Sequence, residues 1–232
     1  MLESLREEVC AANLAVRDAG LVTLTWGNVS GYDPDAGAMA IKPSGVDYAE
    51  LTPDRIPIVS VEDGRQLWSD LRPSSDTPTH LVLYRRLADV CGIVHTHSTH
   101  ATAWAQTRRS LPCYGTTHAD HFRGTVPVTR MLTPDETRGE YEHNTGLVIA
   151  ELYGPGKLDP LQVPAALVAG HGPFAWGASA QSAVENAVVL EEVARMASIT
   201  EAASEVPRPL PRRLVDRHFL RKHGRNAYYG QH

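Results

Sequence analysis

Two histidines separated by one residue follow an apolar stretch of the sequence. Ile93 and Val94 are β-branched residues typical of a buried strand, and His95 and His97 come directly after them. Because alternate side chains of a strand point to the same face, the two imidazoles are predicted to lie close enough to bind one metal ion. Two solvated histidines on an edge strand are an equally good interpretation of the pair alone. Further ligands elsewhere in the chain favour the metal.

Two other residues are candidates to complete the ligand set. His171 lies between Gly170 and Gly172, and glycine on both sides lets the backbone approach another group closely. Asp76 precedes the helix that leads to the histidine strand, where an N-cap carboxylate is the alternative role. Three imidazoles and one carboxylate suit one divalent ion per chain, Zn²⁺ first and Mn²⁺ second. Four protein ligands are typical of a closed structural site, so turnover requires Asp76 to loosen or the metal to expand its coordination.

Three short loops are rich in small hydrogen-bond donors. They contain Gly27 and Asn28, Ser44 and Gly45, and Ser74 and Ser75. Hydroxyls, amides and glycine N–H groups are suited to phosphate oxygens, although each loop taken alone is an ordinary turn. The loops form one anion site only if the fold brings them together, and then the anion lies near Asp76. We interpret Lys42 as a solvated surface lysine that could add a positive charge there.

The stretch Thr-Thr-His-Ala-Asp-His at 116–121 is also unusual. Asp120 within it is either a proton carrier or an ion-pair partner of His118 or His121. The remaining histidines do not share the strand spacing of His95, so we do not expect them to be ligands. They are His80, His100, His143, His218, His223 and His232.

Composition excludes several classes of protein. The chain has 232 residues, of which 42% are hydrophobic and 21% charged, as in a globular protein with a sizeable core. The net charge of −5 predicts no binding to nucleic acid or to anionic membranes. Three scattered cysteines indicate reduced thiols rather than a disulfide framework. No apolar run approaches the roughly 20 residues of a membrane span, so we expect a soluble, cytoplasmic protein.

The pattern of elements predicts one mixed α/β domain over residues 1–232. Hairpin-type connections, such as the turn between 56–61 and 65–68, favour a largely antiparallel sheet. Helices are expected at 2–19, from Thr77, over 98–106, from Thr133 to about Tyr153, and over 179–203. Strands are expected at 21–25, 38–42, 92–97 and within 165–176. A proline-rich spacer at 207–211 leads to a basic, aromatic tail.

Several stretches along the whole chain match one superfamily in register. They are LVTLTWGNVS (21–30), IKPSGVDY (41–48), PSSDTPTH (73–80), GIVHTHS (92–98), GTTHAD (115–120), HGPFAWG (171–177), RKHG (221–224) and AYYGQ (227–231). The chain resembles the class II aldolase and adducin head-domain superfamily, and within it the L-ribulose-5-phosphate 4-epimerase family. The stretch at 115–120 and the tyrosines of the tail favour the epimerases over the aldolases. One departure is His121, which stands where an aromatic residue is expected.

The resemblance implies a fold, an assembly and a set of roles. The fold is a single domain with a central, largely antiparallel sheet flanked by helices, and the assembly is a cyclic homotetramer with active sites between subunits. The implied metal ligands are Asp76, His95, His97 and His171; the implied phosphate-binding residues are Gly27, Asn28, Ser44, Gly45, Ser74 and Ser75; the implied proton carriers are Asp120 and Tyr229. We further expect the tail, residues 207–232, to dock on a neighbouring subunit.

The implied reaction interconverts L-ribulose 5-phosphate and D-xylulose 5-phosphate. C4 is not adjacent to the C2 ketone, so its inversion requires cleavage and re-formation of the C3–C4 bond. Two alternatives are a metal-dependent aldolase that releases both fragments and a non-catalytic, adducin-like assembly module. Product analysis separates the aldolase from the epimerase. Metal content separates both enzymes from the assembly module.

Overall fold

Seven strands form a single antiparallel sheet in the computed structural model, which describes residues 2–225, 227 and 228. The strands are β1 (Asn28–Asp33), β2 (Ala38–Ile41), β3 (Ile58–Ser60), β4 (Gln66–Trp68), β5 (Gly92–His95), β6 (Ala165–Leu167) and β7 (Pro173–Gly177). Their order is β4-β3-β2-β1-β5-β7-β6, and every neighbouring pair is antiparallel. The predicted antiparallel sheet is confirmed, and the histidine strand β5 lies inside it, between β1 and β7.

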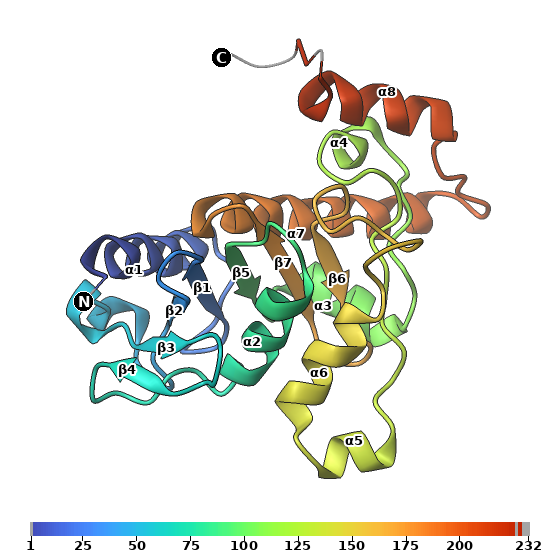
Figure 1. Cartoon of the computed structure of the whole chain (residues 1–232). Helices are drawn as coiled ribbons and strands as arrows, with labels where there is room; N and C mark the ends of the chain where they lie inside the picture. The colour runs from blue at the N-terminus through green and yellow to red at the C-terminus, as the bar shows by residue number, and fades with distance from the viewer. Residues whose placement is uncertain (1, 226, 229–232) are drawn as a thin grey trace.

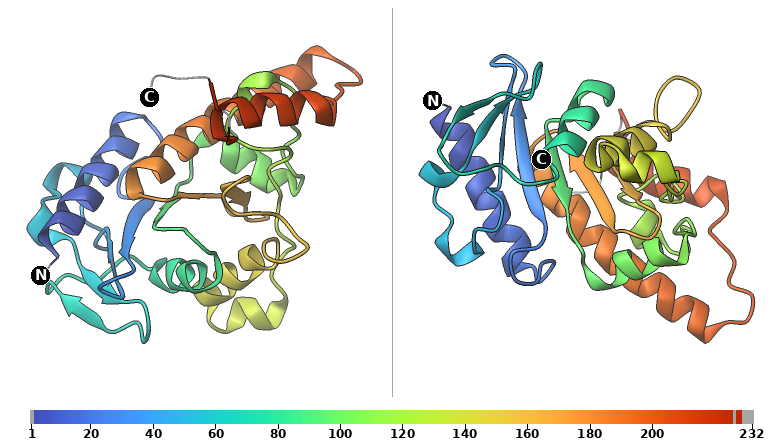
Figure 2. Two further views of the ribbon diagram at one scale, coloured as in Figure 1. Left: turned by 45° about the horizontal axis from the view of Figure 1, so that its top comes forward. Right: turned by 90° about the horizontal axis from the view of Figure 1, so that it is seen from below.

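Helices cover both faces of this sheet (Figures 1 and 2). The α-helices are α1 (Glu3–Asp18), α2 (Thr77–Arg86), α3 (Thr99–Thr107), α4 (Thr116–Ala119), α5 (Pro134–Arg138), α6 (Tyr141–Ala150), α7 (Ala180–Ala203) and α8 (Arg212–His223), and two 3₁₀ turns span Tyr48–Glu50 and Pro53–Arg55. Among the described residues, no helix has the length and apolar character needed to cross a bilayer.

Alternation along the strands separates two hydrophobic cores. Val94 of β5 and Ala175 of β7 belong to the core formed with α1, α3 and α7. Ile93 and Phe174, one residue earlier on the same strands, belong to the core formed with α2 and α6. Each completely buried aliphatic side chain stabilises the fold by about 1.5–3 kcal/mol. His95 shares the face of Ile93, so its imidazole projects toward α2 and α6.

A third, smaller core joins α4 to α8. Cys113, Ala119 and Val215 are buried together, with Leu210 packed against them. In Figure 1 this pair of helices lies beyond α7, on the side away from α2 and α6. The tail was predicted only as a basic, aromatic segment, but its first part is the helix α8, packed on its own chain.

Two predicted elements differ in the structure, the strand at 21–25 and the single helix from Thr133 to about Tyr153. Residues 21–25, predicted as a strand, form turns and irregular backbone, and β1 begins only at Asn28. The cause is tertiary, because the buried Lys42, just after β2, binds the carbonyl group of Thr25, and Tyr48 binds those of Trp26 and Gly27 just after the segment. The helix expected from Thr77 is present as α2, with Asp76 at the N-cap position but without a capping hydrogen bond from its side chain, and with Pro78 in the first turn.

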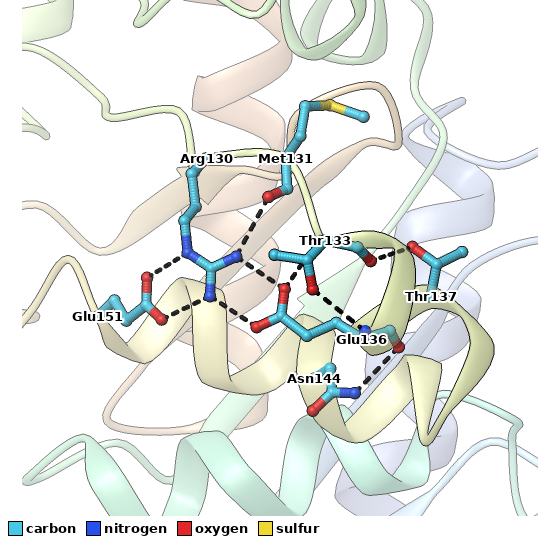
Figure 3. A network of polar contacts seen from close by, with 7 residues as sticks. All are labelled: Arg130, Met131, Thr133, Glu136, Thr137, Asn144 and Glu151. Atoms are coloured by element: carbon cyan, nitrogen blue, oxygen red, sulfur yellow. Dashed lines mark hydrogen bonds and ion pairs between the residues drawn. The ribbon is translucent and has the colours of Figure 1, made fainter.

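The predicted helix from Thr133 to about Tyr153 is two helices, α5 and α6. Gly139 between them has a non-helical backbone. The capping box of Thr133 and Glu136 is present, as expected. Arg130 binds both Glu136 of α5 and Glu151 just after α6, and Asn144 donates to the carbonyl of Glu136 (Figure 3). This polar network fixes α6, the helix that flanks His171.

Candidate metal centre

Three imidazoles converge at one end of the central strands. His95 is the last residue of β5, His97 follows it, and His171 lies in the turn between β6 and β7. One ligand atom from each ring lies within 4.8 Å of the others, and the Nε2 atoms of His95 and His97 are 3.1 Å apart. The strand ends at His95, yet both side chains still meet on one side as the spacing predicted. Three nitrogens at this separation fit around one divalent ion.

Contacts outside the cluster fix the ring of His95. Its Nδ1 atom lies 3.0 Å from the carbonyl oxygen of Pro173, so Nδ1 carries the proton and Nε2 keeps its lone pair for a metal. The ring also stacks on Phe174 at 4.2 Å between centroids. Gly172 is required nearby, because a Cβ there would lie 2.9 Å from the carbonyl oxygen of Thr96. Of the two glycines beside His171, Gly172 therefore permits the close approach that the sequence indicated, whereas Gly170 has φ of +73° and no close neighbour.

The cluster favours neutral imidazoles, the form that binds metal ions. Burial, together with the neighbouring rings of His95 and His97, lowers the pKa of His171 to about 4, against the opposing effect of Asp76. Burial and the ring of His95 likewise lower the pKa of His97. Protonation of His97 or His171 at neutral pH is therefore unfavourable even without a metal ion.

Asp76 faces the same site but is not a helix cap. Its side chain makes no capping hydrogen bond to α2; instead, Nδ2 of Asn28 donates to Oδ2 of Asp76 at 2.7 Å. Burial alone would raise the pKa of this carboxyl group, but His95, His80 and the Asn28 hydrogen bond outweigh burial and lower it. The carboxylate therefore lies near the cluster, although it is not among the groups whose ligand atoms all lie within 4.8 Å of one another.

The fold brings the three donor-rich loops together. Ser44 N–H donates to the carbonyl of Arg72, and Ser74 N–H donates to the carbonyl of Lys42, which pairs the second loop with the third. Asn28 of the first loop reaches the third through Asp76. Gly27 allows the first loop to pass over the histidine strand, because a Cβ there would lie 2.9 Å from the carbonyl oxygen of His95. Gly45 has φ of +70° and open space beside its Cα.

Lys42 is not the solvated surface lysine that the sequence analysis expected. Its side chain is buried, and Nζ donates to the carbonyl oxygens of Val46 at 2.8 Å and Thr25 at 3.3 Å. Burial lowers the pKa of the ammonium group to about 8, against the opposing effect of Asp47. The Tyr48 hydroxyl group lies 2.9 Å from the carbonyl oxygen of Gly27 and donates to it. These two side chains replace the strand pairing predicted for residues 21–25.

Asp120 belongs to the α4–α8 unit, the group of residues around the small third core. Arg221 donates to both carboxylate oxygens, at 3.0 Å and 2.7 Å, and His218 Nδ1 lies 3.1 Å from Oδ1. Burial raises the pKa of Asp120, but the hydrogen bonds from Arg221 and His218 outweigh burial and lower it. Its ion-pair partners are therefore neither His118 nor His121. Within the described residues, no hydrogen bond or ion pair joins Asp120 to the histidine cluster.

Comparison with known proteins places the chain in a family. The sequence profile of the class II aldolase and adducin N-terminal domain matches residues 7–198. This chain belongs to that family. Two curated relatives, from Salmonella paratyphi B and Salmonella typhi, are each 51% identical to it over 230 residues, which is 99% of this chain and 100% of each relative. Both are named L-ribulose-5-phosphate 4-epimerase UlaF.

Solved structures of class II aldolases share the fold. An L-fuculose 1-phosphate aldolase is superimposed with a TM-score of 0.77 at 24% identity, covering 93% of this chain and 94% of that one. The L-fuculose-1-phosphate aldolase from Thermus thermophilus gives 0.68 at 23% identity, covering 89% and 100%. These matches confirm the predicted class II aldolase-like fold.

The sequence analysis did not identify three residues that contact Asp120 or the histidine cluster, namely His218, Arg221 and Tyr141. His218 and Arg221 lie about 100 positions from Asp120, at separations of 98 and 101, so only the fold shows the pairing. Tyr141 of α6 has its hydroxyl group 3.4 Å from Nδ1 of His171. Tyr229, the second predicted proton carrier, lies outside the described residues.

Proposed function

We propose that this chain is a metal-dependent epimerase that interconverts L-ribulose 5-phosphate and D-xylulose 5-phosphate. The observation that carries the proposal is the three-histidine cluster with Asp76, bordered by three donor-rich loops, in a chain 51% identical to named epimerases. The cluster supplies ligands for a divalent ion, and the loops supply donors for a phosphate group. An adducin-like assembly module needs neither feature.

The reaction requires a carbon–carbon bond to break. Loss of the C4 hydroxyl proton allows the C3–C4 bond to cleave, and its electron pair enters an enediolate over C2 and C3. The other product is glycolaldehyde phosphate. Rotation of this aldehyde presents its other face, and attack by C3 then re-forms the bond with inverted configuration at C4. Atoms and electrons balance without a redox cofactor.

His95, His97, His171 and Asp76 are the proposed metal ligands, with Zn²⁺ the preferred ion. A divalent cation bound there supplies Lewis-acid stabilisation of the negative charge that develops on bond cleavage, worth several kcal/mol. The chain's own contribution is to hold the imidazoles neutral and correctly oriented. The Pro173 carbonyl and the Phe174 ring do this for His95.

The three loops are proposed to bind the substrate phosphate. Ser44, Gly45, Ser74, Ser75, Gly27 and Asn28 are the proposed contacts. Lys42 holds the first and second loops together through the carbonyls of Thr25 and Val46 and brings a positive charge to them. Holding the phosphate keeps the aldehyde fragment bound while its carbonyl turns over, which is the step that separates epimerisation from simple cleavage.

Asp120 and Tyr229 are proposed to exchange a proton with the C4 oxygen on opposite faces of the aldehyde. Arg221 and His218 keep Asp120 ionised, the state that accepts a proton. Because α4 and α8 lie beyond α7 from the cluster, we propose that the α4–α8 unit serves the metal centre of a neighbouring subunit. A cyclic homotetramer with shared sites satisfies this requirement.

Incubation of the metal-loaded protein with L-ribulose 5-phosphate tests the function. Appearance of D-xylulose 5-phosphate is the expected result. Release of dihydroxyacetone and glycolaldehyde phosphate as the main products would identify an aldolase instead. Absence of both reactions in a protein of full metal content would overturn the proposal.

A further inference from the structure

A buried hydrogen-bonded chain runs from α2 to β1 beside the cluster. The Ser30 hydroxyl group lies 2.7 Å from Nδ1 of His80 and 2.7 Å from the hydroxyl group of Tyr84. All three side chains are buried, His80 completely. The remaining ring nitrogen, Nε2 of His80, is buried and has no hydrogen-bond partner among the described residues. An unpartnered polar atom at such depth is costly, so it points to a function.

The order of protons along this chain can be deduced. The Tyr84 phenol keeps its proton, because burial raises its pKa, and Ser30 is the acceptor within reach. The single proton of Ser30 is then free to be donated to Nδ1 of His80. A neutral imidazole carries one proton, on the ring nitrogen that does not accept a hydrogen bond. That proton is on Nε2, which makes the orphaned atom a donor.

The position of His80 places this donor next to Asp76. The two residues are separated by one turn of α2, and the His80 backbone N–H donates to the Asp76 carbonyl oxygen. Asn28 and Ser30 lie two residues apart on one face of β1. The side chain of Asn28 binds Asp76, and the side chain of Ser30 binds His80. Asn28 already occupies Oδ2 of Asp76. A carboxylate accepts hydrogen bonds only, so Nε2–H is the complementary group.

We propose that His80 is a positioning residue whose Nε2–H group attracts the Asp76 carboxylate from its buried side, although the two groups are not hydrogen-bonded in the structure. Held by Asn28 and attracted by His80, the carboxylate has fewer lone pairs free, and binds a metal through one oxygen at most. Binding through one oxygen rather than two leaves room for the ion to expand its coordination to a fifth ligand from the substrate. The inference rests on the proposed metal centre.

Metal affinity, measured by competition with a chelator, tests His80 independently of activity. His80→Phe keeps the ring and removes the donor, and it should weaken Zn²⁺ binding about 10–100-fold. His80→Gln retains an N–H donor and should recover much of that loss. Tyr84→Phe, at the far end of the same chain, leaves Nε2 in place but no longer fixes the direction of the Ser30 hydroxyl group, so it should weaken Zn²⁺ binding less than His80→Phe does.

A double-mutant cycle separates positioning from a merely structural role. If His80 acts through Asp76, His80→Phe should have almost no effect on Zn²⁺ affinity in an Asp76→Asn background. An equal loss in both backgrounds, or no loss in either, overturns the proposal. If His80→Phe does not fold, Ser30→Ala can replace it in the same double-mutant cycle, and it should weaken Zn²⁺ binding by a few-fold. A wild-type protein that binds no Zn²⁺ would instead overturn the metal centre itself.

Discussion

The histidine cluster and the α4–α8 unit are built by different forces. His95 is anchored in an interior strand, with β1 on one side and β7 on the other, and its ring stacks on Phe174. Asp120 lies just after a four-residue helix and is held by charged partners from α8. Apolar packing is insensitive to salt, whereas ion pairs are weakened by it. In the proposed active site these two regions are a metal half-site, which we expect to be the more rigid, and a proton-transfer half-site held by ion pairs.

The largest expected effect comes from removing a ligand of the rigid half-site. His97→Asn should strip the metal ion and lower the epimerisation rate by about 10³-fold or more, because the Lewis acid is lost. Elemental analysis and product assay measure the two effects. His143→Asn, on α6 and outside the cluster, is the matched control and should keep its metal. Full metal content in His97→Asn would contradict the assignment.

The second expected effect tests the other half-site. Asp120→Asn should retain the metal and lower the rate by about 10²–10⁴-fold, the range for loss of a proton carrier. Mixed with His97→Asn chains in one oligomer, it should regain activity, because each interface can pair an intact cluster with an intact α4–α8 unit. Random mixing should restore about a quarter of wild-type activity.

The control for this mixing is a pair of variants in the same half-site. Asp120→Asn with Tyr229→Phe should give no rescue if both residues act from one subunit. Mass spectrometry should verify that the chains have mixed. Rescue of this pair, or no rescue when Asp120→Asn is mixed with His97→Asn, would contradict the proposed division of the active site between subunits.

The histidine cluster and the α4–α8 unit also differ in how much of each could be predicted from the sequence. The histidine cluster was predictable because strand alternation and glycine-flanked turns are local patterns with fixed geometry, as at His95 and His171. The antiparallel sheet was predictable from hairpin-type connections. The assignment of roles depended on family resemblance as well as on local pattern.

Long-range polar contacts were not predictable. Lys42 resembles any surface lysine in sequence, and only the fold shows that two loop carbonyls surround its ammonium group. The segment 21–25 has strand-forming residues, but Lys42 and Tyr48 bind carbonyl groups in and just after it instead. Likewise, nothing local connects Asp120 to α8. Such contacts depend on which distant segments the core brings together.

A smaller effect is expected at the phosphate loops. Ser75→Ala removes one donor to a charged group and should raise KM for L-ribulose 5-phosphate by about tenfold. Lost positioning should also lower kcat, while metal content should stay the same. Ser4→Ala, an exposed serine of α1, is the control. Unchanged KM and kcat would make Ser75 an ordinary turn residue.

The smallest expected effect is a pH dependence from Lys42. With a pKa of about 8, its ammonium group should lose its proton between about pH 7.5 and about pH 9, so KM should rise about eightfold over that window. The substrate phosphate, with a second pKa near about 6, does not titrate there. Burial lowers the pKa of both His97 and His171, so these rings are neutral throughout. Lys42→Arg should flatten the profile, because guanidinium stays charged.

The titration of Lys42 should stabilise the fold over the same pH range in which it weakens substrate binding. The pKa of a lysine in the unfolded chain is about 10.4, so between about pH 8 and that value the unfolded state binds more protons than the folded state. The free energy of unfolding should therefore rise with pH across this window while substrate affinity falls. Urea unfolding at several pH values measures the first trend, and KM the second. If Lys42 is solvated instead, its pKa will be ordinary and neither trend will differ from that of Lys42→Met. Opposed trends that both vanish in Lys42→Met would show that burial of this ammonium group destabilises the fold in order to place a positive charge at the phosphate loops.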